Sequence, residues 1–286
     1  MAKKTIAYQG EPGANSHIAC VEVFPDWEPL PKPTFEDAFG AVIDGSAQLA
    51  MIPVENSVAG RVADIHHLMP TSGLNIVGEF FLPIQHQLMA LPGASLETVK
   101  TAYSHPQALG QCRITLRKLG LEPRIAADTA GAARRLAETT DLTRAAIASR
   151  LAAEIYGLRI IAPDISDEDY NTTRFLILSR EPDWAPANNG PVVTTFVFKV
   201  RNVPAALYKA LGGFATNGVN MTKLESYQIE GEFVATQFYA DVEGHPDDVG
   251  MRHALEELAF FSAEVKILGV YPGHPFRYEE RKKTKK

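Results

Sequence analysis

The chain has 286 residues, of which 45% are hydrophobic and 22% charged, a composition typical of a globular protein of about two domains. This composition excludes a disordered chain and a collagen-like repeat. Lys and Arg total 28 against 34 Asp and Glu, so the formal net charge of -6 argues against a general affinity for nucleic acid or for an anionic membrane. An anionic ligand therefore needs a specific binding site.

The N-terminus and the two cysteines indicate the location of the protein and whether it binds a metal. The N-terminus has no long apolar stretch, and no segment approaches the ~20 apolar residues of a membrane span. Cys20 and Cys112 are far apart and outside any Cys-x-x-Cys pattern, which argues against a disulfide framework and a zinc site. We therefore expect a cytoplasmic protein with no metal and no cofactor.

Short apolar or β-branched runs alternate with helical segments from Lys3 to about Arg180. The predicted strands are 5–8, 49–54, 101–103, 124–127, 145–148 and 172–178, and predicted helices follow Asn15 or Ser16, Thr34 and Pro106, the last running to about Leu119. This alternation predicts an α/β domain with mainly parallel strand pairing. Residues 74–91 lack a helix, so we interpret them as the crossing into a second lobe of about 82–170.

The clearest linker is 181–191, which collects Pro, Gly and Asn between two apolar runs. A second domain at 192–272 is predicted to have the β-α-β-β-α-β order of a ferredoxin-like module. Its elements are strand 192–200, helix 204–216, strands 219–229 and 233–242 joined at Glu230-Gly231, helix 245–261 and strand 265–270. Residues 273–286 end in the basic run 281–286, which we interpret as a solvated tail.

Small polar residues follow four of the predicted strands, whereas the familiar catalytic signatures are missing. The sequence has no Gly-x-Ser-x-Gly, P-loop, Gly-x-Gly-x-x-Gly or His-Glu-x-x-His motif. In open α/β sheets, ligands bind at the carboxyl ends of strands, where helix N-termini present free N–H groups to anions. The segments there predict a cleft for a small polyanion; they are 9–16, 53–60, 104–109 and 171–175.

These segments resemble the motifs of prephenate dehydratase, in that family's order and spacing. They are YQGEPGANS (8–16), PVENS (53–57), SHPQAL (104–109) and TRF (173–175), and VNMTKLES (219–226) resembles the phenylalanine-binding segment of the family's ACT domain. The resemblance implies a two-lobed, periplasmic-binding-protein-like catalytic domain at 1–182 and an ACT regulatory domain at 192–272. We expect a monofunctional enzyme, because the chain begins almost directly at the dehydratase motif and leaves no room in front for the chorismate mutase helices that some relatives carry.

The resemblance implies the conversion of prephenate to phenylpyruvate, water and carbon dioxide in phenylalanine biosynthesis. Thr173 matches the family's catalytic threonine, whose hydroxyl would donate to the departing oxygen, with Glu55 or His105 restoring its proton. The expected substrate-binding residues are Gln9, Gly10, Asn15, Ser16, Asn56, Ser57, Ser104, Gln107, Arg174 and Phe175. Neutral donors suit this role because a strong cation would hold the carboxylate charge that decarboxylation must dissipate.

Strand alternation puts Thr173 and Phe175 on one face of a regular strand and Arg174 on the other. Either the strand begins after Thr173, or Arg174 supports the cleft from behind. Arg174 is therefore a carboxylate clamp or a structural ion pair.

The ACT resemblance implies that L-phenylalanine binds between the modules of a homodimer or homotetramer and regulates the enzyme. The implied phenylalanine-binding residues are Ala206, Leu207, Asn220, Met221, Thr222, Glu225 and Ser226. Two departures put the strength of this regulation in question. Tyr227-Gln228 stands where the family usually has Arg-Pro, and Ala205-Ala206-Leu207 stands where it usually has Gly-Ala-Leu.

Other functions remain open at this stage. The chain could instead be an arogenate dehydratase, whose substrate carries an amine where prephenate has a keto group. The sequence does not separate the two substrates. A small-anion binding protein would use the same cleft without chemistry, but it would normally carry an export signal. A ligand-sensing regulator built on the ACT module would have no need of Thr173-Arg174-Phe175.

Overall fold

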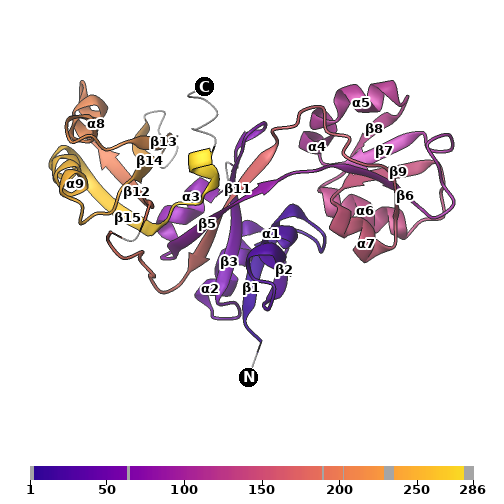
Figure 1. The fold of residues 1–286 in the computed structure, drawn as a ribbon, viewed down its shortest axis with the longest axis horizontal. Coiled ribbons are helices and arrows are strands. Elements are labelled where there is room, and N and C mark those ends of the chain that lie inside the picture. The colour runs from indigo at the N-terminus through magenta and orange to yellow at the C-terminus, as the bar shows by residue number, and fades with distance from the viewer. Residues whose placement is uncertain (1–2, 63–64, 189, 202, 229–234, 280–286) are drawn as a thin grey trace. The chain divides into compact units, whose positions relative to one another are not determined.

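The structure, a computed structural model, describes residues 3–62, 65–188, 190–201, 203–228 and 235–279 (Figure 1). Its contacts divide the chain into two compact units. Unit 1 comprises Met1–Val62 and Phe80–Phe175, and unit 2 comprises Ala63–Glu79 and Leu176–Lys286. No helix within the described ranges is long and apolar enough to cross a membrane.

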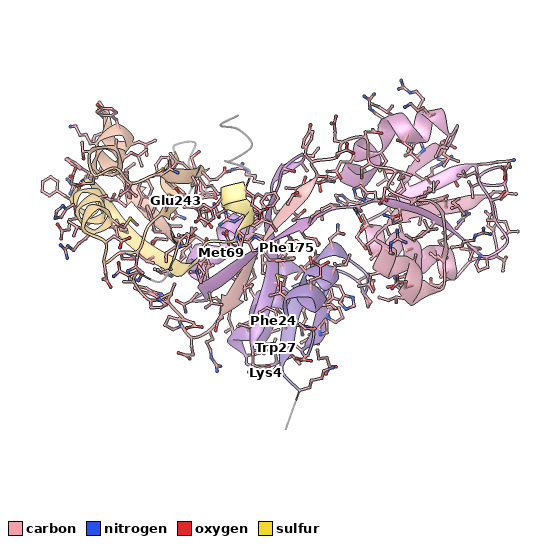
Figure 2. All side chains as sticks on the ribbon, viewed as in Figure 1. Lys4, Phe24, Trp27, Met69, Phe175 and Glu243 are labelled. Atoms are coloured by element: carbon pink, nitrogen blue, oxygen red, sulfur yellow. The ribbon has the colours of Figure 1, made fainter. Side chains whose placement is uncertain are left out.

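The first lobe of unit 1 is built around β1 (Thr5–Gln9), which pairs in parallel with β2 (Glu28–Lys32) and β3 (Leu49–Asn56). Helices α1 (Asn15–Val23) and α2 (Phe35–Ile43) connect these strands. Thr34 begins α2 because its side chain accepts a hydrogen bond from the backbone N–H of Asp37, as in a standard N-cap. At the amino ends of β1 and β2, Lys4 lies 5.2 Å from the ring centroid of Trp27, which also packs against Phe24 (Figure 2).

The second lobe is a five-stranded sheet in the order β10-β6-β9-β7-β8. Its strands are β6 (Gln87–Ala90), β7 (Thr101–Ser104), β8 (Glu122–Ile125), β9 (Arg144–Ala148) and β10 (Arg159–Ala162). Pairing is parallel for β7 with β8 and β9, but antiparallel for β6 with β9 and β10. The prediction of mainly parallel pairing is wrong for β6, whose neighbours β9 and β10 both run antiparallel to it. The chain enters β6 from β5 (Asn75–Pro83), a strand of the other sheet, and not from a β-α-β crossover within this one.

Helices cover both faces of this second sheet (Figure 1). Ala145 and Ile147 pack with α4 (Pro106–Gln111) and α5 (Arg113–Lys118), whereas Ala146 and Ala148 pack with α6 (Thr129–Ala137) and α7 (Arg150–Tyr156). This alternation follows from the two-residue period of a strand. The single helix predicted up to Leu119 is wrong, because the backbone leaves helical geometry at Cys112 and divides the segment into α4 and α5.

Unit 2 contains the predicted ferredoxin-like order. Strands β12 (Val192–Val200), β13 (Met221–Gln228), β14 (Ala235–Glu243) and β15 (Ser262–Pro272) form the antiparallel order β13-β14-β12-β15, with α8 (Ala206–Thr216) and α9 (Val249–Phe261) on one face. Its core contains Phe196, Phe198, Phe214 and Leu258. The predicted turn at Glu230-Gly231, the start of the next strand at Phe233 and the basic run 281–286 lie outside the described residues.

Residues 63–79 and 176–182, which the sequence analysis assigned to the N-terminal domain, lie in unit 2. They include α3 (Ile65–Thr71) and parts of β5 and β11 (Thr172–Ser179), two strands that begin in one unit and end in the other. Ile76 pairs with Gly269 of β15, and the carboxylate of Glu79 forms an ion pair with Arg277. These contacts explain why the segment belongs with the C-terminal part of the chain.

Candidate active site

The end of β3 and the start of β11 lie side by side in unit 1. The N–H of Ser57 donates to the carbonyl of Thr172 (2.9 Å), and the N–H of Thr172 donates to the Ser57 hydroxyl oxygen (2.9 Å). The Ser57 hydroxyl donates in turn to the carbonyl of Tyr170 (2.6 Å). Ser57 therefore joins the two motifs through the backbone, and both hydrogen-bonding roles of its hydroxyl are used within the chain.

Asn56 lies at the centre of a polar network beside this junction. Its Oδ1 accepts hydrogen bonds from the N–H groups of Val58 (3.0 Å) and Ala59 (2.8 Å), which determines the orientation of the amide. Its Nδ2 therefore faces Asn171 Oδ1 (2.7 Å) and Thr173 Oγ1 (3.0 Å) as a donor. The Thr173 oxygen accepts from Asn56, so its own proton is directed to another acceptor.

The network continues into the second lobe through Gln111. Asn171 Nδ2 donates to Gln111 Oε1 (3.0 Å), and the same oxygen lies 2.7 Å from His86 Nε2. Asn171 and His86 are each only 4% exposed, and burial lowers the pKa of the His86 imidazole below its ordinary value of 6.5. Sequence reasoning did not name His86 or Gln111 as site residues, and it included Asn171 only as part of the cleft segment 171–175. Gln111 had a signal, because it lies one helical turn after Gln107.

A cavity of about 410 Å³ adjoins this network within unit 1. Arg113 is the cationic residue of its lining, which consists of Val58, Ala59, Gln107, Gly110, Gln111, Arg113, Ile114, Ser166, Asp167, Glu168 and Asn171. The Asp167 carboxylate caps α5 by accepting from the N–H groups of Ile114 (2.8 Å) and Thr115 (3.0 Å). Burial favours a higher pKa for Asp167, but these hydrogen bonds outweigh it and hold the pKa below its ordinary range.

Arg174 is buried on the face of β11 opposite Thr173. It is 2% exposed, and its Nη1 donates to Glu55 Oε1 at 2.9 Å. Because β11 already begins at Thr172, the alternative in which the strand starts after Thr173 is wrong. Arg174 thus forms a buried ion pair, and Glu55 lies against this guanidinium. The role of Glu55 in restoring the Thr173 proton stays a prediction.

The other expected substrate-binding residues are dispersed. Gln107 lines the 410 Å³ cavity, whereas Asn15 lines a separate cavity of about 350 Å³. The ring of His105 caps α4 by accepting from the N–H of Gln107. Ser104 is fully buried, and its hydroxyl donates to the carbonyl of Ile147 (2.7 Å) to hold β7 against β9. Phe175 and Ser16 are buried. The side-chain amide of Gln9 donates to the carbonyl of Pro33 (3.3 Å), and the backbone N–H of Gly10 donates to the carbonyl of Lys32 (2.9 Å).

The turn between β1 and α1 contacts helix α7. Ser149 Oγ donates to the carbonyl of Gly13 (2.6 Å), and the Tyr156 hydroxyl donates to the carbonyl of Pro12 (2.9 Å). Gly13 has a φ of +89°, and a Cβ there would lie 2.6 Å from Ala152 Cα. This position therefore requires glycine for both its conformation and its close approach to the helix.

The expected phenylalanine-binding residues lie at two ends of the ferredoxin-like module. Met221 is level with Val242, near the start of β12, whereas Ser226 is level with Phe238, near the end of β12 that leads to Ala206 and Leu207. At about 3.3 Å per residue, Asn220 and Ser226 are about 20 Å apart along the strand. The side chain of Asn220 donates a hydrogen bond to the Glu243 carboxylate, and the Thr222 hydroxyl donates to the carbonyl of Asp241. Glu225 forms an ion pair with Lys223.

Neither unit assembles a metal centre from the residues that the structure describes, since these contain no group of three or more His, Cys, Asp or Glu side chains arranged to hold a metal ion.

Comparison with known proteins identifies the family. A model of the family described as prephenate dehydratase matches residues 6–183. The chain is 50% identical to a Komagataeibacter europaeus protein named bifunctional N-acyl-homoserine lactone acylase/prephenate dehydratase, over 96% of this chain and 98% of that protein. It is 39% identical to arogenate dehydratase/prephenate dehydratase 1 of Arabidopsis thaliana, over 95% of this chain and 72% of that protein.

A solved crystal structure of a related protein has the same fold as this chain. Prephenate dehydratase from Arthrobacter aurescens in complex with L-Phe is 32% identical and superposes with a TM-score of 0.86, over 94% of this chain and 90% of that chain. The predicted two-lobed α/β part followed by a ferredoxin-like part is confirmed. With the matched model covering 6–183, these findings lead to one conclusion: the chain belongs to the prephenate dehydratase family of lyases.

Proposed function

We propose that the chain converts prephenate to phenylpyruvate, water and carbon dioxide, with the hydroxyl proton of Thr173 directed at the departing hydroxyl group. The observation that carries this proposal is the 3.0 Å hydrogen bond from Asn56 Nδ2 to Thr173 Oγ1. Because Asn56 donates to the threonine oxygen, Asn56 cannot take the threonine proton, and that proton can be donated to the substrate.

Aromatisation drives this reaction, so the protein has only to assist the two departing groups. The bond to the ring carboxylate breaks, and its electron pair enters the ring as carbon dioxide leaves. The bond from the ring to the hydroxyl oxygen breaks at the same time, and the oxygen takes a proton to leave as water. A threonine hydroxyl is a weak acid, so it acts chiefly by a preorganised hydrogen bond to the charge that develops on this oxygen.

The two carboxylates of the substrate need different surroundings. The ring carboxylate must lose its charge, so neutral amides such as those of Gln107 and Asn171 suit it better than a cation. The carboxylate of the pyruvyl side chain keeps its charge throughout, and Arg113 is suited to hold it. We infer that Arg113→Gln raises KM with little change in kcat, because that contact is the same in the ground and transition states.

Turnover of purified protein tests the proposal directly. We expect wild-type protein to form phenylpyruvate from prephenate, and Thr173→Ala to lose activity while keeping the wild-type circular dichroism spectrum. No formation of phenylpyruvate by wild-type protein would overturn it. Arogenate must be assayed beside prephenate, because the Arabidopsis relative carries both activities in its name; formation of phenylalanine at the higher kcat/KM would favour arogenate dehydratase.

We further propose that unit 2 binds L-phenylalanine between two copies of the chain and that this binding inhibits the enzyme. The support is the L-Phe complex of the Arthrobacter relative and the 20 Å separation of the expected contact residues, which one amino acid cannot bridge within a single module. Titration of the full chain with L-phenylalanine should raise Tm and lower activity in a dimer or tetramer. An unchanged Tm at millimolar L-phenylalanine would contradict the regulatory role.

A second activity is favoured by the 50% identity to the bifunctional Komagataeibacter protein over nearly the whole of both chains. If this chain is also an acylase, it will release homoserine lactone and a fatty acid from an N-acyl-homoserine lactone. Thr173→Ala should separate the two activities if they use different sites. If the protein turns over prephenate but releases no homoserine lactone, the acylase activity is rejected and the dehydratase activity is unaffected.

A further inference from the structure

The cavity of about 410 Å³ in unit 1 has more negative than positive charge in its wall. Of the described residues that line it, Arg113 is cationic, Asp167 and Glu168 are anionic, and the others are neutral. A wall with two negative charges and one positive charge is poorly matched to a ligand that carries negative charge alone. A ligand with both carboxylate and ammonium groups would match it better.

Asp167 is used within the chain. Its carboxylate accepts hydrogen bonds from the N–H of Ile114 (2.8 Å) and from the N–H (3.0 Å) and the hydroxyl (3.1 Å) of Thr115. Burial favours a higher pKa for Asp167, and these hydrogen bonds, together with the positive charge of Arg113, bring the pKa below its ordinary range. The Asp167 carboxylate therefore caps α5 and lies close enough to Arg113 to feel its charge.

Glu168 is the second carboxylate of the wall, and it is available to a ligand. Its side chain is exposed, and it forms no hydrogen bond or ion pair with any other residue in the ranges that the structure describes. Hydrogen bonds fix Asp167 to Ile114, so the residues next to this contact, Glu168 and Arg113, are both held in the wall of the cavity.

A cation and a carboxylate in one cavity are the partners that an α-amino acid requires. The ammonium and carboxylate groups of such a ligand are attached to the same carbon, so the groups that bind them must also lie near each other. Arogenate has this pair of groups at the end of its side chain. Prephenate has a keto oxygen in place of the ammonium group, and the partial negative charge of that oxygen is repelled by a carboxylate.

We propose that Glu168 is a specificity-determining residue of the dehydratase reaction. Its carboxylate binds the ammonium group of arogenate, while Arg113 holds the adjacent carboxylate, and the same charge weakens the binding of prephenate. This inference rests on the proposed function, because it takes the 410 Å³ cavity to be the substrate site.

A matched pair of variants tests the role. Glu168→Gln and Asp169→Asn each remove one exposed carboxylate, but Asp169 is not among the described residues that line the cavity. We expect Glu168→Gln to lower the ratio of kcat/KM for arogenate to kcat/KM for prephenate by about tenfold, through KM, because the contact is the same in the ground and transition states. Asp169→Asn should change this ratio by less than about twofold. An unchanged ratio in Glu168→Gln, or equal changes in the two variants, would overturn the proposal.

A change of sign at the same position separates charge from shape. Glu168→Lys should lower kcat/KM for arogenate further than Glu168→Gln does, and it should raise kcat/KM for the dianionic prephenate above the wild-type value. Glu168→Asp keeps the charge and should keep the wild-type order of the two substrates. A parallel loss of kcat/KM with both substrates in Glu168→Gln would mean that Glu168 only supports its loop, and it would overturn the proposal.

The same preference can be measured without turnover. Thr173→Ala lacks the hydroxyl proposed for catalysis, so calorimetry on this variant follows the binding of each substrate. Addition of Glu168→Gln should weaken the binding of arogenate by about tenfold and leave that of prephenate unchanged or tighter. If wild-type protein turns over neither substrate, the proposed function is rejected, but this difference in binding would still support the role of Glu168. Turnover of prephenate without turnover or binding of arogenate would overturn the inference and leave the proposed function intact.

Discussion

The side-chain amide of Asn56 donates to the hydroxyl oxygen of Thr173 across 3.0 Å, although the two residues are 117 positions apart in the sequence. Two backbone N–H groups hold the carbonyl oxygen of the same amide, so Asn56 cannot turn to accept from the threonine. This contact determines where the threonine proton goes, and several of the following predictions depend on it.

Removal of the Thr173 hydroxyl should disable the chemical step. We expect Thr173→Ala to lower kcat by about a hundredfold or more, because one preorganised hydrogen bond to a developing charge contributes roughly 3 kcal/mol. Thr173→Ser should lose less, since the hydroxyl remains and only a methyl contact is removed. Steady-state kinetics of both variants with prephenate provide the measurement, and wild-type turnover by Thr173→Ala would exclude Thr173 from catalysis.

Reversal of the Asn56 donor should redirect the threonine proton. Asn56→Asp keeps the size of the side chain but presents a carboxylate oxygen where the N–H stood, so the Thr173 hydroxyl will donate to Asp instead of to the substrate. We expect kcat to fall at least as far as in Thr173→Ser, and KM to rise because the new charge repels the dianionic substrate. A variant with unchanged kcat would show that the direction of this hydrogen bond is irrelevant to catalysis.

Loss of the Glu55 charge should destabilise the protein. Arg174 is 2% exposed and pairs with Glu55, so Glu55→Gln leaves a buried guanidinium with less compensation, and we expect a loss of about 3 kcal/mol in the free energy of unfolding. The control is Glu122→Gln, whose partner Arg124 is exposed; it should change stability by less than about 1 kcal/mol. Urea unfolding measures both, and equal effects would contradict the buried-pair argument.

The turn at residues 10–14 lies so close to α7 that Gly13 should not tolerate a side chain. In Gly13→Ala, the Cβ adds a clash with Ala152 to the strain of a positive φ. Gly93→Ala is a matched control, because Gly93 also has a positive φ of +95° but has no atom within 4 Å of the added Cβ. We expect Gly13→Ala to lower Tm clearly more than Gly93→Ala. Equal shifts in Tm would show that α7 can move to accept the added Cβ without a loss of stability.

Acidification should weaken the fold through buried and half-buried histidines. The pKa values of His17, His86 and His274 lie below 6.5, first of all because burial disfavours the charged rings. Below pH 6.5 the unfolded chain therefore binds more protons than the folded chain. The free energy of unfolding should be fully present above that pH and should decrease as the pH falls through 6.5 toward the folded-state pKa values. Urea unfolding at about pH 7.5 and about pH 5.5 checks this. The single His→Gln variants should each reduce the pH dependence, and a constant free energy would contradict it.

Much of the fold is local enough to be predicted from the sequence. The β-α-β-β-α-β order of 192–272 follows from hydrophobic periods that report each element separately, and the structure confirms it. The break at Cys112 was missed, and so was the antiparallel pairing of β6, which depends on how strands distant in sequence meet in one sheet. The same limit applies to 63–79, whose partners Gly269 and Arg277 lie about two hundred positions away in the sequence.

The sequence by itself determined the family, through motifs that name Thr173, Asn56 and Gln107 by position. Only the tertiary structure decided what each motif residue contacts. Ser104 and Phe175 are buried, Arg174 pairs with Glu55, and Asn56 donates to the Thr173 hydroxyl oxygen. The contact of His86 with Gln111 could not be identified from the sequence, because a single histidine after an apolar strand carries no local signal of its partner. The polar network from Asn56 to His86 joins side chains from four separate segments, and a hydrogen bond has a direction only when donor and acceptor stand at fixed positions in space.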